Sequence, residues 1–182
     1  MATPTALPAS FTAGDVLTAA NLNLLRGAFR VLQVASTIKS DTFTASSTTF
    51  TDVTGLSVSI TPNYTSSKIL IVASLTGSQD AGTDPCSIRL VRDSTAIAVG
   101  NAAGSRVQAS ASFSSADGNV VSCANIVFLD SPATTSATTY KIQVRTNQSA
   151  ANTVFINRCE IDTDAAISSR TVSTITVFEV SA

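Results

Sequence analysis

The chain has 182 residues, a length that suits one compact domain with a sizeable hydrophobic core. Its 11 Lys and Arg residues nearly balance its 12 Asp and Glu residues and are scattered along the chain, so we expect neither nucleic acid nor an anionic membrane as a partner. The chain contains no His, which excludes a His-based catalytic triad and a His-ligated metal site. We therefore expect no catalytic residue, no cofactor and no metal ion.

The N-terminal region is expected to form an extended arm followed by one short helix. Pro4 and Pro8 favour an extended conformation over residues 1–12. Apolar residues at helical spacing predict a helix over about residues 19–30, with Thr18 as its N-cap. The residues that follow this spacing are Leu22, Leu25, Phe29 and Leu32. An isolated helix of this length is marginal in water, so its apolar stripe must pack against its own domain, sister chains or a larger assembly.

The sequence predicts neither a secretory signal nor a membrane span. Its first ten residues lack a basic region followed by an apolar run. The longest aliphatic stretch, residues 69–73, is far shorter than the roughly 18 residues that a membrane span requires. We expect a soluble protein that is made in a cytosol.

From about residue 31 the hydrophobic pattern has a period of two, and about nine or ten short strands separated by turn residues are predicted, with no second helix. Such spacing favours an antiparallel β-sandwich, and a jelly roll fits the strand number best. We therefore expect an anchoring arm with a short helix over residues 1–35 and a β-sandwich over residues 36–182. The expected strands are VLQVAST, TFTDVTG, LSVSITP, KILIVASL, CSIRLVRD, STAIAVG, NVVSCANIVFLD, TTYKIQVRT, NTVFINRC and TVSTITVFEV.

Alternation within the expected strands predicts which side chains are buried. In TTYKIQVRT, the side chains of Tyr140, Ile142 and Val144 should point into the core, because they alternate with charged and amide residues. The segments KILIVAS and CANIVFL are almost continuously apolar, which is typical of strands that are covered on both faces. A second layer, such as another subunit, is therefore expected outside the sandwich.

Pairs of carboxylates could perform acid–base chemistry, and the densest acidic patches lie in turns. These patches contain Asp80 with Asp84, and Asp162 with Asp164 and Glu160. In turns rich in small residues, the commonest use of Asp is to accept hydrogen bonds from backbone N–H groups, and we adopt that interpretation. The three cysteines, Cys86, Cys123 and Cys159, lack the close spacing of metal sites, and we expect ordinary, partly buried thiols.

Three loops have compositions that make them candidate binding sites. Residues 100–106, GNAAGSR, contain the glycines of a phosphate-binding loop but lack its Lys and its following helix, so a structural turn leading into a strand at Arg106 is the favoured interpretation. Residues 114–119 and 146–152 are rich in side chains that could bind polar ligands such as glycans. With no Trp available as a stacking platform, solvated loops without a ligand remain the favoured interpretation.

The segment FTAGDVLTAANLN resembles the N-terminal segment of many bacteriophage virion proteins, which has the form aromatic-x-x-Gly-(Asp/Glu)-Val-Leu-Thr-Ala-x-x-(Leu/Met)-Asn. The matching residues are Phe11, Gly14, Asp15, Val16, Leu17, Thr18, Ala19, Leu22 and Asn23. The remainder, including KILIVASL and RTVSTITVFEV, is similar to a β-rich domain common in phages of cyanobacteria and other aquatic bacteria. Proteins with this domain are often described as tail fibre or virion structural proteins.

The resemblance implies a homotrimeric, jelly-roll-like protein of the virion, synthesised in the cytoplasm of the host bacterium and attached to the particle by its N-terminal segment. We expect a short tail fibre or baseplate-attached adhesin that contacts other virion proteins and binds a host surface glycan. The alternative is a capsid cement or decoration protein, or a head fibre. A polysaccharide depolymerase is disfavoured, because the acidic residues lie in scattered turns. The residues expected to form the anchoring or assembly interface are Phe11, Val16, Leu17, Leu22, Leu25 and Phe29.

Overall fold

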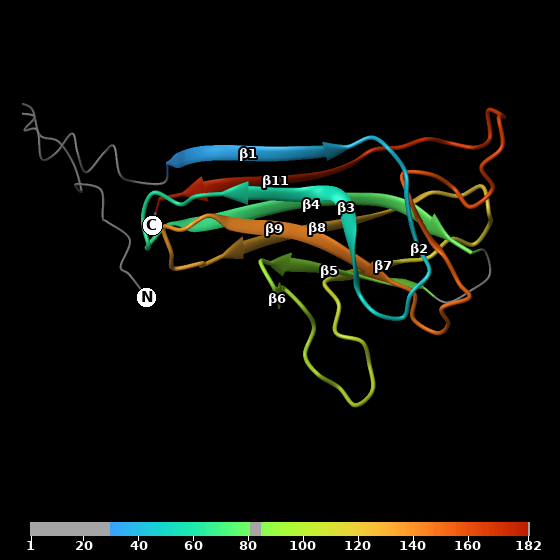
Figure 1. Ribbon diagram of the computed structural model, residues 1–182, viewed down its shortest axis with the longest axis horizontal. Helices are drawn as coiled ribbons and strands as arrows, with labels where there is room; N and C mark the ends of the chain where they lie inside the picture. The colour runs from blue at the N-terminus through green and yellow to red at the C-terminus, as the bar shows by residue number, and fades with distance from the viewer. Residues whose placement is uncertain (1–29, 81–84, 182) are drawn as a thin grey trace, which may run out of the picture.

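The computed structural model describes residues 30–80 and 85–181, which form an elongated body with its strands along the long axis (Figure 1). All regular secondary structure within these residues is β-strand, which confirms a mainly β fold. The expected helix over residues 19–30 lies outside the described residues, apart from Arg30. The first strand begins at Val31, so residues 31–35, which were expected to be part of the arm, lie in a sheet.

The strands alternate along the chain with turns and loops, in the order expected from the sequence. Their bounds are β1 (Val31–Lys39), β2 (Phe43–Ala45), β3 (Thr51–Ile60), β4 (Lys68–Gln79), β5 (Cys86–Arg92), β6 (Thr95–Ile97), β7 (Ala111–Phe113), β8 (Ser122–Asp130), β9 (Thr138–Arg145), β10 (Val154–Ile156) and β11 (Ser173–Val180).

The strands form two antiparallel sheets. Sheet A has six strands in the order β1-β11-β4-β10-β2, with β8 also paired to β4, and sheet B has five in the order β3-β9-β5-β6, with β7 also paired to β5. In sheet A, β10 continues the row of β11 along one edge of β4, and β2 continues the row of β1. In sheet B, β6 and β7 likewise share one edge of β5. Each sheet therefore has four rows of strands.

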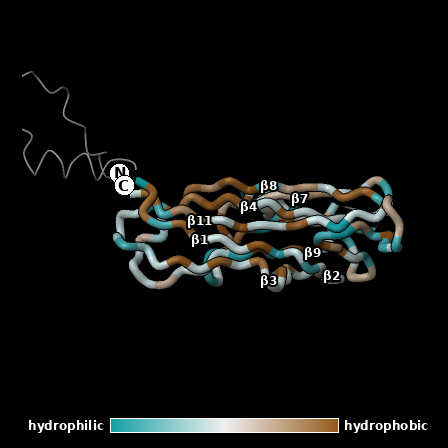
Figure 2. The backbone as a smooth tube through the Cα atoms, turned by 90° about the horizontal axis from the view of Figure 1, so that it is seen from above, coloured by the Kyte–Doolittle hydropathy of each residue, from teal (hydrophilic) through white to brown (hydrophobic). Residues whose placement is uncertain are grey.

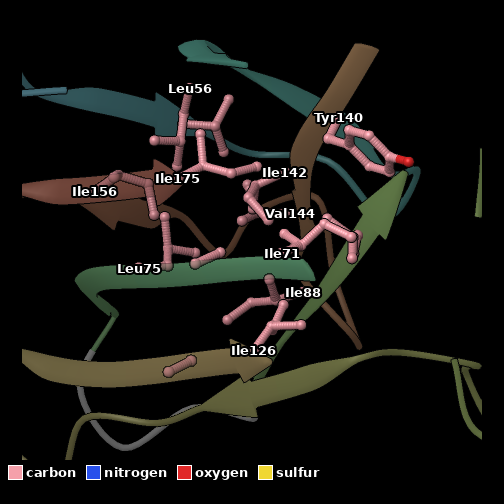
Figure 3. Close-up of a cluster of buried hydrophobic side chains, with 14 of the residues drawn as sticks. Leu56, Ile71, Leu75, Ile88, Ile126, Tyr140, Ile142, Val144, Ile156 and Ile175 are labelled. Atoms are coloured by element: carbon pink, nitrogen blue, oxygen red, sulfur yellow. The ribbon is translucent and has the colours of Figure 1, made fainter. Parts of the chain in front are cut away.

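The hydrophobic core lies between the two sheets. Tyr140, Ile142 and Val144 of β9 are fully buried, as their alternation predicted. They face residues of sheet A such as Ile71 and Ile175 (Figure 3). The large side chains that are almost wholly inaccessible include Leu56, Ile69, Ile71, Leu75, Ile88, Leu90, Tyr140, Ile142, Ile156 and Ile175. Because both sheets supply these side chains, the core holds the sandwich together along its length.

Three strands differ from the expectation. The segments TFTDVTG and LSVSITP were expected to be separate strands but form one strand, β3, whose register shifts between Asp52 and Ser57. Gly55 lies in this irregularity with a φ of 83°, so it allows a bulge where the sequence suggested a turn. The short strands β2 and β7 were not predicted, because three residues carry too little periodicity to be recognised.

At one end of the sandwich, the Glu179 carboxylate of β11 holds neighbouring segments together, and this residue is fully buried. It accepts hydrogen bonds from Gln33 Nε2 at 2.7 Å and from the backbone N and Nδ2 of Asn63 at 2.7 and 2.8 Å. Burial by itself would raise the pKa of this carboxyl, but the hydrogen bonds outweigh burial and hold its pKa below the ordinary value. Glu179 thus fixes the β3–β4 connection against β11.

Further along sheet A, β4 stops pairing with β11 and begins to pair with β10. Asn157 joins the segments that meet at this point. Its φ is 62°, a left-handed conformation that Asn tolerates better than most residues. Its Nδ2 donates to the carbonyl oxygens of Lys39 at 2.8 Å and Asp41 at 2.9 Å. Its Oδ1 accepts from Ser173 Oγ at 2.6 Å and Thr76 Oγ1 at 3.2 Å. This fully buried side chain therefore connects the ends of β1 and β11 to β4.

We predict that Asn157→Ala lowers the free energy of unfolding by about 2 to 4 kcal/mol, because buried carbonyl groups lose their donors and Ala is strained at this φ. Urea denaturation measures this difference. Asn101→Ala, at an exposed position, is the control and should change stability by less than about 0.5 kcal/mol. An Asn157→Ala protein as stable as the control would show that this junction does not depend on the Asn157 side chain.

Candidate functional site

The residues expected to anchor the protein lie outside the part of the chain that the structure describes. These residues are Phe11, Val16, Leu17, Leu22, Leu25 and Phe29. Their role in anchoring or assembly therefore remains a prediction. The described chain begins at Arg30, whose backbone N donates to Ser181 Oγ at 3.0 Å. Any attachment made by the preceding residues therefore starts from the end of the sandwich where β11 finishes.

The acidic residues of the turns do not gather into a cluster. Asp80 Oδ2 accepts a hydrogen bond from the backbone N of Thr153 at 2.7 Å, which is the turn-stabilising role expected from the sequence. Asp162 instead forms ion pairs with Arg170 at 2.8 Å and Arg158 at 3.5 Å. Over residues 30–80 and 85–181, no three His, Cys, Asp or Glu side chains are placed where they could hold a metal ion together. Asp84 lies outside these ranges.

The three cysteines are free thiols in different environments. Cys86 and Cys159 are buried, and Cys123 is exposed on β8. Burial raises the pKa of the Cys86 thiol to about 12, so it stays protonated and unreactive at neutral pH. Cys123 Sγ lies 3.4 Å from Ser74 Oγ on the neighbouring strand. The expectation of ordinary thiols fits Cys86 and Cys159 best, because only Cys123 is open to solvent.

A buried polar group crosses the core between the sheets. Asp130 of β8 accepts hydrogen bonds from Arg92 Nη1 at 2.9 Å and from the Tyr140 hydroxyl at 2.7 Å. Burial and the neighbouring Asp130 carboxylate both raise the pKa of the Tyr140 phenol, which keeps it a hydrogen-bond donor. Because Arg92 and Tyr140 belong to sheet B and Asp130 to sheet A, this group fixes the sheets relative to each other.

An open, shallow groove of about 590 Å³ lies between sheet B and the loop that joins β6 to β7. This loop is drawn in yellow-green and projects from the body in Figure 1. The loop is closed at its base, where Gly100 N donates to the Ala109 carbonyl at 3.1 Å and Gln108 Nε2 donates to the Gly100 carbonyl at 2.8 Å. The residues that line the groove are Pro85, Ser87, Gly100, Ser105, Arg106, Val107, Ala109, Ser110, Ala111, Ser112 and Asn147.

The groove brings together two loops that lie far apart in the sequence. Arg106 belongs to the loop over residues 100–106, for which a structural turn is the favoured interpretation, and Asn147 belongs to the loop over residues 146–152, whose side chains could bind polar ligands. Asn147 Oδ1 accepts a hydrogen bond from Ser87 Oγ at 2.7 Å. Arg106 is the one charged residue of the lining and is exposed. The groove offers several hydroxyl groups and one guanidinium group to a polar ligand, but no aromatic ring on which a sugar could stack.

The outer face of sheet A, which points away from the core, carries a continuous row of apolar side chains. Inward residues of β4 such as Ile69 and Ile71 are fully buried, whereas Val72 on the same strand is exposed. Strand β8, much of which is brown in Figure 2, alternates in the same way. We define the outer face by its apolar residues Val34, Ile38, Leu70, Val72, Val127, Leu129 and Phe178.

The strand register places these outward side chains in transverse rows. One row is entirely apolar, the next has two polar and two apolar residues, and the third has one apolar and three polar residues. The rows are Val34, Phe178, Leu70 and Leu129; Ser36, Thr176, Val72 and Val127; and Ile38, Thr174, Ser74 and Asn125. None of these positions carries a charge. The face is thus uncharged over these rows and most apolar in the first of them, and the described chain supplies no second layer to cover it.

The chain was compared with known proteins. No family model and no curated protein matches it. Within the described residues, there is no helix with the length and apolar character needed to cross a membrane.

Proposed function

We propose that the chain is a non-enzymatic structural protein of a phage virion: a homotrimeric short tail fibre or baseplate-attached adhesin, anchored by its N-terminal segment. The observation that carries this proposal is the exposed apolar outer face of sheet A, where Ile38 and Val127 have 67% and 68% of their surface exposed. A protein that works by assembly needs such a surface, because buried apolar area provides most of the free energy of association. The FTAGDVLTAANLN segment adds the resemblance to virion proteins.

We infer further that the sandwich is a jelly roll. In a jelly roll of eight strands, the first pairs with the eighth, the second with the seventh, the third with the sixth and the fourth with the fifth. When strands that share a row are taken together, β1 pairs with β11 and β3 with β9. In the same way, β4 pairs with β8, and β5 pairs with β6 and β7. The strand order of both sheets supports this assignment.

The positions of the chain ends and loops support an outward-pointing sandwich. Strand β1 begins beside the end of β11, where Ser181 N donates to the Arg30 carbonyl at 2.9 Å. The orange-red loop over residues 161–169 lies at the opposite end of the body (Figure 1). An anchor that precedes Arg30 would therefore attach one end of the sandwich to the particle and leave the other end free to contact a host surface.

The open groove beside Arg106 is the surface that we propose for a host glycan. A single groove with hydrogen-bonding groups and no aromatic ring binds weakly, since each hydrogen bond contributes little beyond what water provides. Three copies held in one trimer raise the effective concentration of the second and third groove, so that weak sites act together. An adhesin can therefore attach firmly through this groove without a deep pocket.

Attachment to the particle tests the proposed function. Gold-labelled antibody raised against residues 30–181 should decorate the tail or baseplate of intact phage particles in negative-stain electron microscopy. Particles assembled with Leu22→Glu and Leu25→Glu in the expected anchor should lose the label, because the charges disrupt the apolar stripe. Ala20→Glu, on the opposite face of the expected helix, is the control and should keep the label. Label spread over the head would favour the capsid decoration protein, and particles without any label would contradict a virion protein.

Binding to host cells tests the adhesin assignment. The purified trimer should bind host cells and compete with infection, and Arg106→Ala should weaken binding by about tenfold or more, because a hydrogen bond to a charged group contributes about 1.5 to 3 kcal/mol. Arg30→Ala is the matched control, since this Arg is also exposed but lies outside the groove, at the end of the sandwich that carries the expected anchor. Equal binding of host cells by both variants would show that the groove takes no part in host attachment.

A further inference from the structure

We propose that three copies of the chain pack with their outer faces of sheet A turned toward a common three-fold axis, with β1 of each copy beside β8 of the next. This inference rests on the homotrimer of the proposed function and identifies the surface that forms it. The outer face is the apolar surface defined above, between the lateral strands β1 and β8 (Figure 2).

The most exposed apolar side chains lie on the two lateral strands of this face. On β1, Val34 is 54% and Ile38 is 67% exposed, and on β8, Val127 is 68% and Leu129 is 54% exposed. In a closed ring, each copy contacts one neighbour with one edge and the other neighbour with the opposite edge. The two lateral strands provide these two different edges, and both are apolar.

The width of the face fits three copies around an axis. Neighbouring edge strands must stay about 4.8 Å apart, so three faces of four strand rows form a triangle with sides of about 24 Å, whose centre lies about 7 Å from each sheet. Packed sheets lie about 10 Å apart, so side chains of each sheet reach about 5 Å from its backbone. The large side chains of Phe178 and Leu70, on the two central strands β11 and β4, would therefore approach the axis, whereas four copies would place the axis about 11 Å from each sheet and leave a hole there.

Three of the hydroxyl groups on the face are already paired with other side chains. Ser36 Oγ and Thr176 Oγ1 lie 2.8 Å apart, and Ser74 Oγ lies 3.4 Å from Cys123 Sγ. Hydroxyl groups that are already paired on the face lose little when water is removed. None of the positions in the three rows is charged. The next outward position on β4 is Lys68, whose Nζ donates to Ser131 Oγ at 2.7 Å, so the charge on this side of the sheet is confined to its end.

The helix expected over residues 19–30 is too small to cover the face by itself. A helix over residues 19–30 would be about 18 Å long and about 10 Å wide. Placed across the strands at the level of Val34, it would leave Ile38 uncovered, because these two residues lie about 13 Å apart along β1. It would shield about half of the apolar surface, so another copy of the chain is the occupant that accounts for the whole face.

A charge in the middle of the β8 edge tests the interface. Sedimentation equilibrium of the full chain should give the mass of a trimer, and Val127→Glu should convert it to a folded monomer with the same β-rich circular dichroism spectrum. Ile167→Glu is the matched control, because Ile167 is 62% exposed but lies in a loop outside both sheets, and it should remain trimeric. A wild-type monomer, or a trimer that persists in Val127→Glu, would overturn the proposal.

Cross-linking tests the three-fold arrangement. In a Cys123→Ser background, Val34→Cys combined with Leu129→Cys should form disulfides between neighbouring copies under mild oxidation and give covalent trimers on a non-reducing gel, because Val34 and Leu129 lie in the same transverse row of the face. The pair Val34→Cys and Ile167→Cys should give monomers. Cross-linked products that stop at dimers would indicate a two-fold interface and overturn the proposal, as would the absence of any cross-link.

The results that would contradict this interface differ from the results that would contradict the proposed function. A trimer that forms through the outer face but never labels phage particles would retain this interface and contradict the virion assignment. Labelled particles together with a monomeric purified chain would retain the virion assignment and contradict the interface.

Discussion

The alternation of side chains along β4 is the constraint on which the rest of the structure depends. This strand is paired on both edges, so it cannot rotate without breaking both sets of hydrogen bonds. Once Ile69 and Ile71 point into the core, Leu70 and Val72 must point outward. A strand that is apolar on both sides therefore builds two surfaces: one that stabilises the monomer and one that the monomer leaves exposed.

Buried polar groups on the core side of sheet A hold its outer face rigid. Asp130, through Arg92 and Tyr140, ties β8 to sheet B across the core, and Glu179 and Asn157 fix β11 near its two ends. A preorganised surface loses little conformational entropy when it is buried, so more of its apolar area contributes to association. The buried polar groups thus support the outer face as well as the fold, and they account for a protein that acts through binding.

The sequence predicts the strands well and the sites poorly, for physical reasons. Alternation is a local property, so the burial of Tyr140 and Ile142 follows from β9 alone, and the apolar runs in β4 and β8 already suggest an outer layer. The groove depends on Arg106 and Asn147, which are far apart in the chain and meet only because both lie beside β5. The role of Asn157 could not be foreseen either, since its short side chain is aligned with Lys39 and Ser173 only after β1, β4 and β11 pair.

A crystal structure of the purified full-length chain tests the central claim most directly, because it shows what covers the outer face of sheet A. The account predicts three copies around an axis, with Leu70 and Phe178 close to that axis and Val34 of each copy against Leu129 of the next. An outer face that lies open to solvent, or that is covered by residues 19–30 of its own chain, would contradict it.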